Sequence, residues 1–494
     1  MSADDPLIQR QELTLSPNPR RVLLRPFVPS LVVKPEARPE ASPRILSLFA
    51  RVMMLDEEEV RGKLEEVLAE FDDRHDDIRG IFRDRFEQIR PLLPTDRCLT
   101  EERSLLLGSY FTNEYSFESS ALFNPSMVPA PEADPRDERC RFILSLRATG
   151  EGHISSITFR SGEVGLDGRV KLNPASRIVR SPLPLPAAEY DRAIFRRKLR
   201  ELGLEPGAVQ AATEGLADRF VMEDLVQALK RLRSSGADPE VIRAGSRALI
   251  LAQANYTVRF EDGTDISSRI LFPYAPTEVN GIEDARFVRF SDEEGTRYYA
   301  TYTAYDGSVV LPQMLETRDF QEFTICTLNG PAVKNKGLAL FPRRINGLYT
   351  MLGRQDSENI HIMFSDHLHF WHESEILLRP SQPWEFVQLG NCGSPLETAE
   401  GWLVLTHGVG AMRKYSIGAA LLDLENPRRV IKRLRDPLLR PAPDEREGYV
   451  PNVVYSCGGM IHGEHLILPY AISDTATRFA TVRVRDLLEA MSPV

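Results

Sequence analysis

Hydrophobic and polar positions repeat along this chain, most clearly in its second half. A short segment begins with an aromatic residue or His, continues with four mostly apolar residues and ends, in most copies, with a polar residue. Its copies start at Phe142, Tyr299, Tyr349, Trp402 and His465, and the last four are roughly fifty to sixty residues apart. A repeat of this length, with one small antiparallel sheet per copy, is typical of a β-propeller. The five copies therefore predict a mainly β chain folded as a five-bladed β-propeller.

The last residue of each copy is the next feature of interest. Equivalent positions in the blades of a propeller lie at equal depth around one axis. Arg147, Arg354, His407 and Tyr470 end four of the copies, so we expect their side chains to converge on one central pocket. Basic side chains that meet in a concave centre favour an anionic ligand.

The chain before the first repeat has a different pattern. Residues 1–42 are rich in proline and arginine, which predicts an extended N-terminal arm laid over another surface. Residues 43–115 have apolar positions three and four apart, which predicts a helical subdomain. Asp56 and Thr100, each followed by glutamates, are expected to begin helices.

The repeats occupy residues 116–494, which we interpret as one propeller domain. A helical pattern at about 185–252 interrupts them and predicts an insertion. Insertions between blades are often found at the mouth of the binding site. A role in packing or oligomerisation is an equally good interpretation of this segment.

Composition and charge narrow the classes of function. The formal net charge of -10 disfavours a nucleic-acid partner, so any basic site must be local. The five cysteines lack metal-ligand spacing, and their odd number fits a reducing compartment. The sequence has no apolar run of about eighteen residues and no signal-like N-terminus, so we expect a cytoplasmic protein without a membrane partner. The oligomeric state stays open, with a homo-oligomer among the alternatives.

Candidate chemistry centres on the segment Asn280-Gly-Ile-Glu-Asp-Ala-Arg286. Two adjacent carboxylates repel each other when both are ionised, and a nearby guanidinium favours the charged form of its partner. Glu283, Asp284 and Arg286 can therefore supply a general acid. A solvated surface pair is the alternative interpretation of the same residues. His361, His367, His369 and His372 form a second cluster, but no matching ligand group accompanies them, so we expect no metal site.

Several motifs, in order along the chain, resemble glycoside hydrolase family 130. They are Gly281-Ile-Glu-Asp-Ala-Arg286, Thr303-Ala-Tyr-Asp-Gly307, Lys336-Gly-Leu-Ala-Leu-Phe-Pro342, Met351-Leu-Gly-Arg354, Gly401-Trp402-Leu403 and His407-Gly-Val409. The resemblance runs from roughly Ala121 to the C-terminus, apart from the insertion. It implies a five-bladed propeller and an inverting β-mannoside phosphorylase, with inorganic phosphate as co-substrate and no other cofactor.

The resemblance also implies roles for single residues. Asp284 matches the catalytic acid, which in this family is thought to act through the 3-hydroxyl of the mannosyl unit. The residues that match or accompany the phosphate site are Arg147, Lys336, Arg354 and His407. The residues that we expect to bind the sugar are Asn124, Glu283, Arg286, Asp306, Tyr470 and Asp474. Ala285 and Gly353 stand where the family often has Pro and His, and these departures bear mainly on which mannoside is used.

Three functions follow in order of preference. The first is inverting phosphorolysis of β-mannosidic bonds in manno-oligosaccharides or mannosyl disaccharides, which gives α-mannose 1-phosphate. The second is an inverting β-mannosidase, which needs a carboxylate base about 6.5–9.5 Å from the acid; Asp356, Glu358 and Asp474 are its candidates. The third is a glycan-binding propeller without catalysis, which would need neither Asp284 nor the cations.

Overall fold

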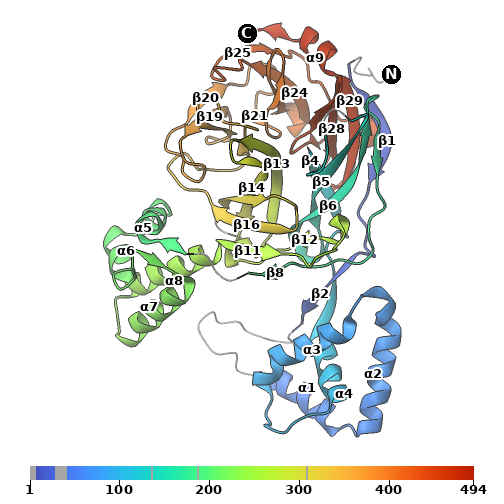
Figure 1. Ribbon diagram of the computed structural model, residues 1–494, viewed down its shortest axis with the longest axis vertical. Helices are drawn as coiled ribbons and strands as arrows, with labels where there is room; N and C mark the ends of the chain where they lie inside the picture. Colours follow the sequence, from blue (N-terminus) through green and yellow to red (C-terminus); the bar gives the residue numbers. More distant parts are fainter. Residues whose placement is uncertain (1–6, 28–41, 135–136, 186–188, 308–309) are drawn as a thin grey trace. The chain divides into compact units, whose positions relative to one another are not determined.

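The computed structural model describes residues 7–27, 42–134, 137–185, 189–307 and 310–494 (Figure 1). The chain divides into two compact units. The larger unit is Met1–Asn18, Glu118–Ala175 and Arg180–Val494, and the smaller is Pro19–Phe117 with Ser176–Val179. Two parts of the predicted N-terminal arm, residues 1–6 and 28–41, lie outside the described residues.

The smaller unit is built of helices around an apolar core. Its elements are α1 (Pro43–Met54), α2 (Glu57–Phe71), α3 (Ile78–Ile89) and α4 (Glu101–Tyr110), with the paired strands β2 (Val22–Pro26) and β3 (Thr112–Ser116). The helix starts predicted at Asp56 and Thr100 are confirmed. The Asp56 carboxylate accepts from the amides of Glu58 and Glu59, and the Thr100 hydroxyl accepts from Arg103, so each cap satisfies otherwise unpaired amides.

Five antiparallel sheets of four to six strands form most of the described part of the larger unit. Sheet 1 contains β4 (Ala121–Pro129), β5 (Arg139–Thr149), β6 (Ser155–Gly165), β7 (Val170–Leu172) and β12 (Ile270–Leu271). Sheet 2 contains β8 (Leu183–Pro184), β11 (Tyr256–Arg259), β13 (Ile282–Asp292), β14 (Gly295–Tyr305), β15 (Val310–Thr317) and β16 (Glu322–Thr327). Sheet 3 contains β17 (Ala339–Leu340), β18 (Tyr349–Gly353), β19 (Ile360–Ser365) and β20 (Glu375–Leu378).

The last two sheets include strands from both ends of the chain. Sheet 4 contains β21 (Gln388–Asn391), β22 (Leu396–Thr398), β23 (Gly401–Val409), β24 (Tyr415–Leu422), β25 (Val430–Arg433) and β30 (Ser492–Pro493). Sheet 5 contains β26 (Val454–Tyr455), β27 (Met460–His462), β28 (His465–Ile472), β29 (Ala476–Arg483) and, from the N-terminus, β1 (Gln9–Leu15). The helix α9 (Val484–Ala490) follows β29.

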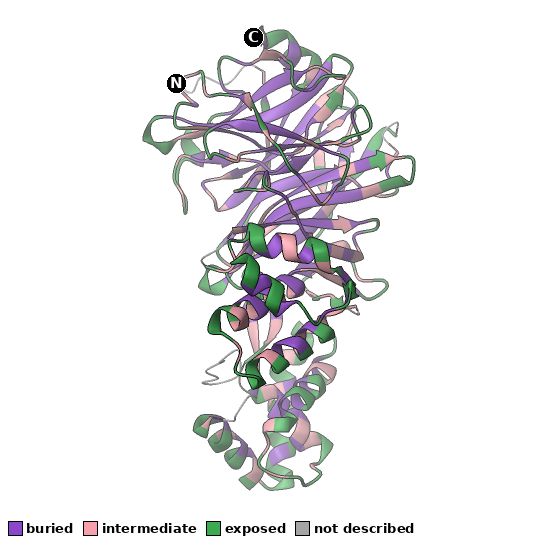
Figure 2. Cartoon of the chain, turned by 90° about the vertical axis from the view of Figure 1, so that its left-hand side faces the viewer, coloured by how far each residue is buried: buried purple, intermediate pink, exposed green. Residues whose placement is uncertain are grey.

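The repeat read from the sequence lies on one strand in each sheet. The strands that carry its five copies are β5, β14, β18, β23 and β28. Their side chains are mostly buried, as Figure 2 shows for the strands of this unit, because both faces of each sheet are covered. The prediction of a mainly β chain is confirmed.

Neighbouring sheets share apolar cores. Phe159 of sheet 1 packs on Phe287 of sheet 2, and the residues that join the other neighbours are Phe290 with Leu340, Phe341 with Trp402, Leu405 with Leu468, and Phe123 with Ala471. The fifth sheet therefore packs on the first. Trp371 and Trp402 are fully buried, as expected for core residues rather than sugar platforms.

The helical insertion has its own core and is held against sheet 2. Its elements are α5 (Arg192–Glu201), α6 (Pro206–Ala212), α7 (Met222–Ser234), α8 (Pro239–Gln253) and the paired strands β9 (Tyr190–Asp191) and β10 (Arg219–Phe220). Lys198 donates to the carbonyl of Leu328, and Glu201 accepts from the amide of Gly330. Across the described ranges, no helix is long and apolar enough to cross a membrane.

Candidate active site

Asp284 lies on a bulge near the start of β13. The pairing of β13 with β14 shifts between Glu283 and Arg286, and Asp284 has a left-handed backbone with φ of 56°. Gly281, just before the strand, has φ of 123°, and a Cβ there would lie 2.8 Å from the amide nitrogen of Ser155. Bulges and positive φ values cost free energy and are concentrated at functional sites, where they redirect a side chain. The backbone therefore turns Asp284 out of the regular alternation of β13.

Asn124 on β4 has the matching distortion. The pairing of β4 with β5 shifts between Phe123 and Ser126, and Asn124 has φ of 48°. The Asn124 amide donates to Asp284 Oδ1 at 2.7 Å. Two bulged strands from different sheets thus hold an amide and a carboxylate together, while Asn124 Oδ1 stays buried without a hydrogen-bond partner. An unpaired buried acceptor of this kind is suited to a ligand hydroxyl.

Arg147 and Lys336 hold the two carboxylates in place. Arg147 donates to Glu283 at 2.8 Å and to Asp284 at 3.3 Å, while its Nε donates to Ser155 Oγ. Lys336 donates to the other oxygen of Glu283 at 2.7 Å. Glu283 is therefore bonded by one cation on each oxygen, and the ion pairs are only partly exposed. Without a ligand, these two cations already neutralise acidic groups of the protein.

Arg286 ties this group to sheets 4 and 5. Its buried guanidinium donates to the carbonyls of Asp284 and Cys392 and to the hydroxyl of Tyr455. Burial lowers the pKa of Arg286, but the surrounding acidic groups outweigh burial and keep it charged. These three hydrogen bonds let Arg286 position the segments around the site. Its expected contact with the sugar stays a prediction.

Arg354 and His407 form a second pair. Arg354 Nη1 lies 3.3 Å from His407 Nε2, and Gln388 Nε2 lies 3.4 Å from the same atom. The imidazole fits because residue 390 is glycine, where a Cβ would lie 2.4 Å from His407 Cε1. Arg354 has no carboxylate partner among the residues that the structure describes, and its Nε is buried without a hydrogen bond. Its positive charge is therefore available to an anion.

His407 does not supply the positive charge that the sequence analysis expected. Burial lowers its pKa well below the ordinary value, and the charges of Arg354 and Arg286 lower it further. The imidazole is neutral at neutral pH and can accept from Arg354 or donate to a ligand, but it is not one of the cations. Of the four residues predicted to bind phosphate, Arg147, Lys336 and Arg354 therefore carry the positive charges.

Two carboxyl groups near Arg147, Asp284 and Asp474, have pKa values that are shifted in opposite directions. Burial raises the pKa of Asp284, but Arg147, Arg286 and the Asn124 amide outweigh it and leave this pKa below the ordinary value. Burial raises the pKa of Asp474 to about 6, helped by the negative charge of Asp284. Asp474 also has a positive φ of 52°, after β28. Carboxyl groups whose surroundings separate their pKa values are typical of acid–base sites.

We predict that Asp474→Asn stabilises the protein at pH 7. A carboxyl whose pKa rises on folding opposes folding as it ionises, so stability is lost as pH rises from about 4 to about 6. Removing that carboxyl should raise the free energy of unfolding at pH 7 by on the order of 2 kcal/mol, with little change at pH 4. Urea unfolding at both pH values measures this. Asp436→Asn, at an exposed ion pair with Arg440, is the control and should show no such difference.

The other predicted residues lie apart from the cluster or at its edge. Asp306, partly exposed, follows β14 beside the start of β13, where Ile282 pairs with Ala304. Tyr470 was expected in the pocket, and its buried side chain instead packs in the core of sheets 4 and 5 while its hydroxyl donates to Glu445 at 2.6 Å. Tyr470 has the same position in its repeat as Arg147 and Arg354 have in theirs, but this does not place its side chain beside them.

The candidate bases have different surroundings. Asp356 accepts from Asn359 and His361 within its own turn, and Glu358 is exposed. Asp474 is the candidate that interacts electrostatically with Asp284 and Arg147. Among the described residues, no group of three or more His, Cys, Asp or Glu side chains is arranged to hold a metal ion.

Sequence reasoning missed Asn391 and Tyr455, which lie on short strands before a repeated segment. Asn391 donates to the carbonyl of Gly337 and keeps a buried oxygen unpaired, while the ring of Tyr455 lies edge-on to His407 at 4.8 Å. Asn124, Asp284, Asn391 and Tyr455 all lie on strands that precede the repeated segment. The signal that would have found them is a polar residue on the strand before each repeat.

Comparison of the sequence with protein-family models and with known proteins identifies its relatives. The family model described as beta-1,4-mannooligosaccharide phosphorylase, of glycoside hydrolase family 130, matches residues 256–493. The match begins after the helical insertion, so Asn124 and Arg147 lie outside it. A 1,2-beta-oligomannan phosphorylase of Thermoanaerobacter sp. (strain X514) is 35% identical over 218 residues, which are 42% of this chain and 71% of that protein.

Two further comparisons concern Listeria innocua. A beta-1,2-mannobiose phosphorylase of its serovar 6a strain is 30% identical over 275 residues, which are 51% of this chain and 74% of that protein. A solved structure of beta-1,2-mannobiose phosphorylase from Listeria innocua, in complex with beta-1,2-mannobiose, aligns with a TM-score of 0.45 and 20% identity over 75% of this chain and 92% of the other.

Proposed function

The chain belongs to glycoside hydrolase family 130, and on this basis we propose that it is a phosphorylase that cleaves β-mannosidic bonds with inorganic phosphate. The substrates would be manno-oligosaccharides or mannosyl disaccharides, and the product of inversion is α-mannose 1-phosphate. Both relatives described above are named for β-1,2-linked mannosides. A β-1,2-linked substrate is therefore the first to test, with a β-1,4-linked one beside it.

The proposed fold is a five-bladed propeller whose blades are sheets 1 to 5. Three observations support a ring. Each sheet packs on the next, and sheet 5 packs on sheet 1. The amide of Leu122 in sheet 1 donates to the carbonyl of Thr475 beside sheet 5. The candidate site takes Asn124, Asp284, Arg354, His407 and Tyr455 from all five sheets in turn.

The observation that carries the phosphorylase proposal is the uncompensated charge of Arg354. Arg147 and Lys336 are bonded to Glu283, whereas Arg354 contacts the neutral imidazole of His407 and has no carboxylate partner within the described residues. An unpaired guanidinium in a partly buried site is costly unless an anion binds there. Phosphate, which carries two charges near neutral pH, fits Arg354 with support from His407 and Arg147.

In the proposed reaction a phosphate oxygen forms a bond to the anomeric carbon of the mannosyl unit. The bond from that carbon to the leaving sugar breaks, and its electron pair stays on the leaving oxygen. A proton from Asp284, passed through the 3-hydroxyl of the mannosyl unit as the family suggests, neutralises that oxygen. In the ligand-free protein Arg147 holds Asp284 ionised. Binding of phosphate would draw Arg147 away and add negative charge, and both changes raise the pKa of Asp284 towards that of a useful acid.

Hydrolysis by water is the alternative, and the candidate bases bear on it. A hydrolase needs a free carboxylate facing the water, but Asp356 is bonded within its turn and Glu358 is exposed. Asp474 is left as the base for that reaction. Its pKa of about 6 permits that role, so the assay must separate the two reactions.

The test is to incubate the protein with β-1,2-mannobiose or β-1,4-mannobiose, with and without phosphate, and to identify the products. We expect mannose 1-phosphate and free mannose in equal amounts, and only in the presence of phosphate. The reverse reaction, from α-mannose 1-phosphate and mannose, should release phosphate. Two mannose per disaccharide at an equal rate in phosphate-free buffer would instead establish a hydrolase.

We also predict that binding of a dianion takes up protons. Sulfate is a suitable probe, since it stays dianionic throughout the neutral range and is unreactive. Bound near Arg354 and Arg147, it should raise the pKa values of Asp474 and Asp284, so that up to about one proton is taken up and affinity falls as pH rises through 6 to 8. Calorimetry in buffers of different ionisation enthalpy counts the protons. Asp474→Asn should reduce the number, and an unchanged number would exclude Asp474 as the titrating group.

A further inference from the structure

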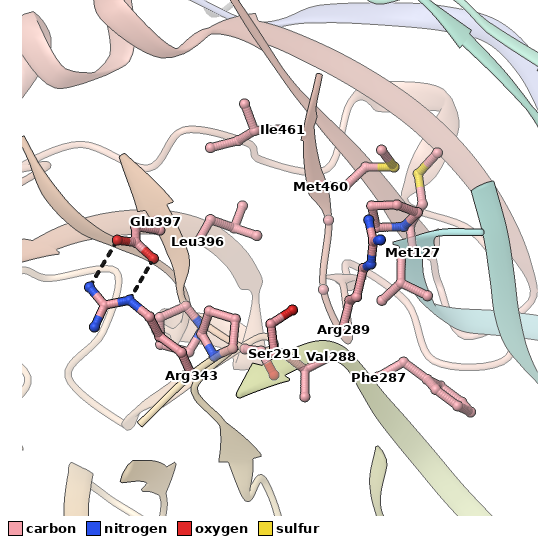
Figure 3. Close-up of a pocket in the computed structure, with 17 residues that line it drawn as sticks. Met127, Phe287, Val288, Arg289, Ser291, Arg343, Leu396, Glu397, Met460 and Ile461 are labelled. Atoms are coloured by element: carbon pink, nitrogen blue, oxygen red, sulfur yellow. Dashed lines mark hydrogen bonds and ion pairs between the residues drawn. The ribbon is translucent and has the colours of Figure 1, made fainter. Parts of the chain in front are cut away.

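A cavity of about 420 Å³ lies further along β4 and β13, two of the strands that carry the candidate site (Figure 3). Each of the five sheets contributes to its lining. The segments are Met127–Pro129 of β4, the part of β13 from Phe287 to Ser291, Pro342 and Arg343 after β17, Ser394–Glu397 before and in β22, and Gly458–Ile461 before and in β27. Asn124 and Asp284 lie three and five residues before Met127 and Arg289 on their strands, which is roughly 10–17 Å of extended chain. The cavity is thus separate from the candidate active site.

The walls are mostly apolar, with one charged group that lacks a partner. Figure 3 shows Arg289 extending between the walls towards Met127 and Met460, while Leu396 and Ile461 line another side. Arg289 makes no hydrogen bond or ion pair within the described ranges, and its Nε is buried without an acceptor. The other arginine of the lining, Arg343, is by contrast bonded to both oxygens of Glu397 at 2.9 Å.

The unpaired guanidinium needs an explanation. The Nε–H of Arg289 is buried without an acceptor, while the side chain as a whole is partly buried. A buried donor of a charged group without a partner is costly and rare in native proteins. Ser394, in the same lining, also has a buried hydroxyl without a hydrogen bond. The two unsatisfied donors thus lie in one cavity whose walls, including Met127 and Met460, are mostly apolar. A mostly apolar pocket with a few converging polar groups is typical of a ligand site. The volume is within the range of small-molecule sites.

We propose that this cavity is a second ligand site, which binds a small amphipathic anion: a carboxylate on an apolar chain or ring. The carboxylate would accept from Arg289, whose planar fork matches two carboxylate oxygens, and from Ser394. The apolar body would lie against Met127, Leu396 and Met460. The Arg343–Glu397 pair, already satisfied, stays at the edge of the cavity.

The test uses octanoate as the anion and 1-octanol as its uncharged counterpart. Each competes with 8-anilinonaphthalene-1-sulfonate, a fluorescent probe with one negative charge on an apolar body. We expect octanoate to displace the probe at much lower concentrations than octanol. Arg289→Met keeps the apolar walls but removes the charge, and should weaken octanoate binding about ten- to a hundredfold while leaving octanol unchanged. Arg139→Met, at an exposed arginine paired with Glu163, is the matched control and should bind as the unchanged protein does.

A second variant guards against misfolding. Leu396→Trp reduces the cavity volume while keeping the charge of Arg289, and should weaken octanoate and octanol alike. Phosphorolysis by the Arg289→Met protein, whose candidate active site is intact, reports folding independently. The proposal is wrong if octanoate and octanol compete equally, or if Arg289→Met binds octanoate as tightly as the unchanged protein does.

Discussion

Asp284→Asn lowers the rate of cleavage of an unactivated mannoside by about 10²–10⁴, the usual contribution of a general acid. The asparagine amide cannot act as an acid. It has the size of the carboxyl group, so it should keep the contact with Asn124, which is 2.7 Å long in the unchanged protein. Binding should change less than turnover, because the remaining sugar contacts stay. The measurement is kcat and KM for mannobiose phosphorolysis in the two proteins.

The control for Asp284→Asn lies on the same strand. Asp292, at the other end of β13, accepts from the amide of Glu294 and lies apart from the candidate site, so Asp292→Asn should keep near-normal turnover. A mannoside with an aryl leaving group needs little protonation, so the loss in Asp284→Asn should shrink with it. Equal losses on both substrates would mean that Asp284 holds the site together rather than supplying the proton.

The repeat in the sequence predicted much of the architecture, because alternation of apolar residues is set by burial on each sheet. It located the strands β5, β14, β18, β23 and β28 and the mainly β fold. It did not locate the short first strands, such as β17 and β26, which have two residues each. Two residues are too few to show alternation. Tyr455 lies on β26, and Asn391 ends β21, which has four residues.

The electrostatic character of the site could not be read from the sequence. Residue type suggested four positive groups around a phosphate, but the charge of His407 depends on its burial and on Arg354. The pairing of Arg147 and Lys336 with Glu283 joins sheet 1, sheet 2 and the segment before sheet 3, and only the folded arrangement reveals it. The prediction for Tyr470 was wrong for a related reason, because its hydroxyl donates a hydrogen bond to Glu445, which lies in a distant segment.

Arg354→Met raises the phosphate concentration needed for half-maximal rate about ten- to a hundredfold. A charge-assisted hydrogen bond to an ionised group contributes roughly 1.5–3 kcal/mol, and each 1.4 kcal/mol is a factor of ten. Methionine keeps the apolar length of the side chain, so the fold should hold. The KM for the mannoside should move less, because Arg354 contacts His407 rather than the carboxylates of Glu283 and Asp284. The measurement is the rate of mannobiose phosphorolysis at varied phosphate.

The matched control for Arg354→Met is Arg344→Met, in the same sheet region but stacked on Tyr349 at 4.2 Å and exposed. Its phosphate requirement should equal that of the unchanged protein. The His407→Gln variant refines the assignment further. Since His407 is neutral before phosphate binds, its loss removes one uncharged hydrogen bond and should raise the phosphate requirement less than Arg354→Met does. If Arg354→Met left the phosphate requirement unchanged, the free positive charge would have another purpose and the phosphate site would have to be sought at Arg147 and Lys336.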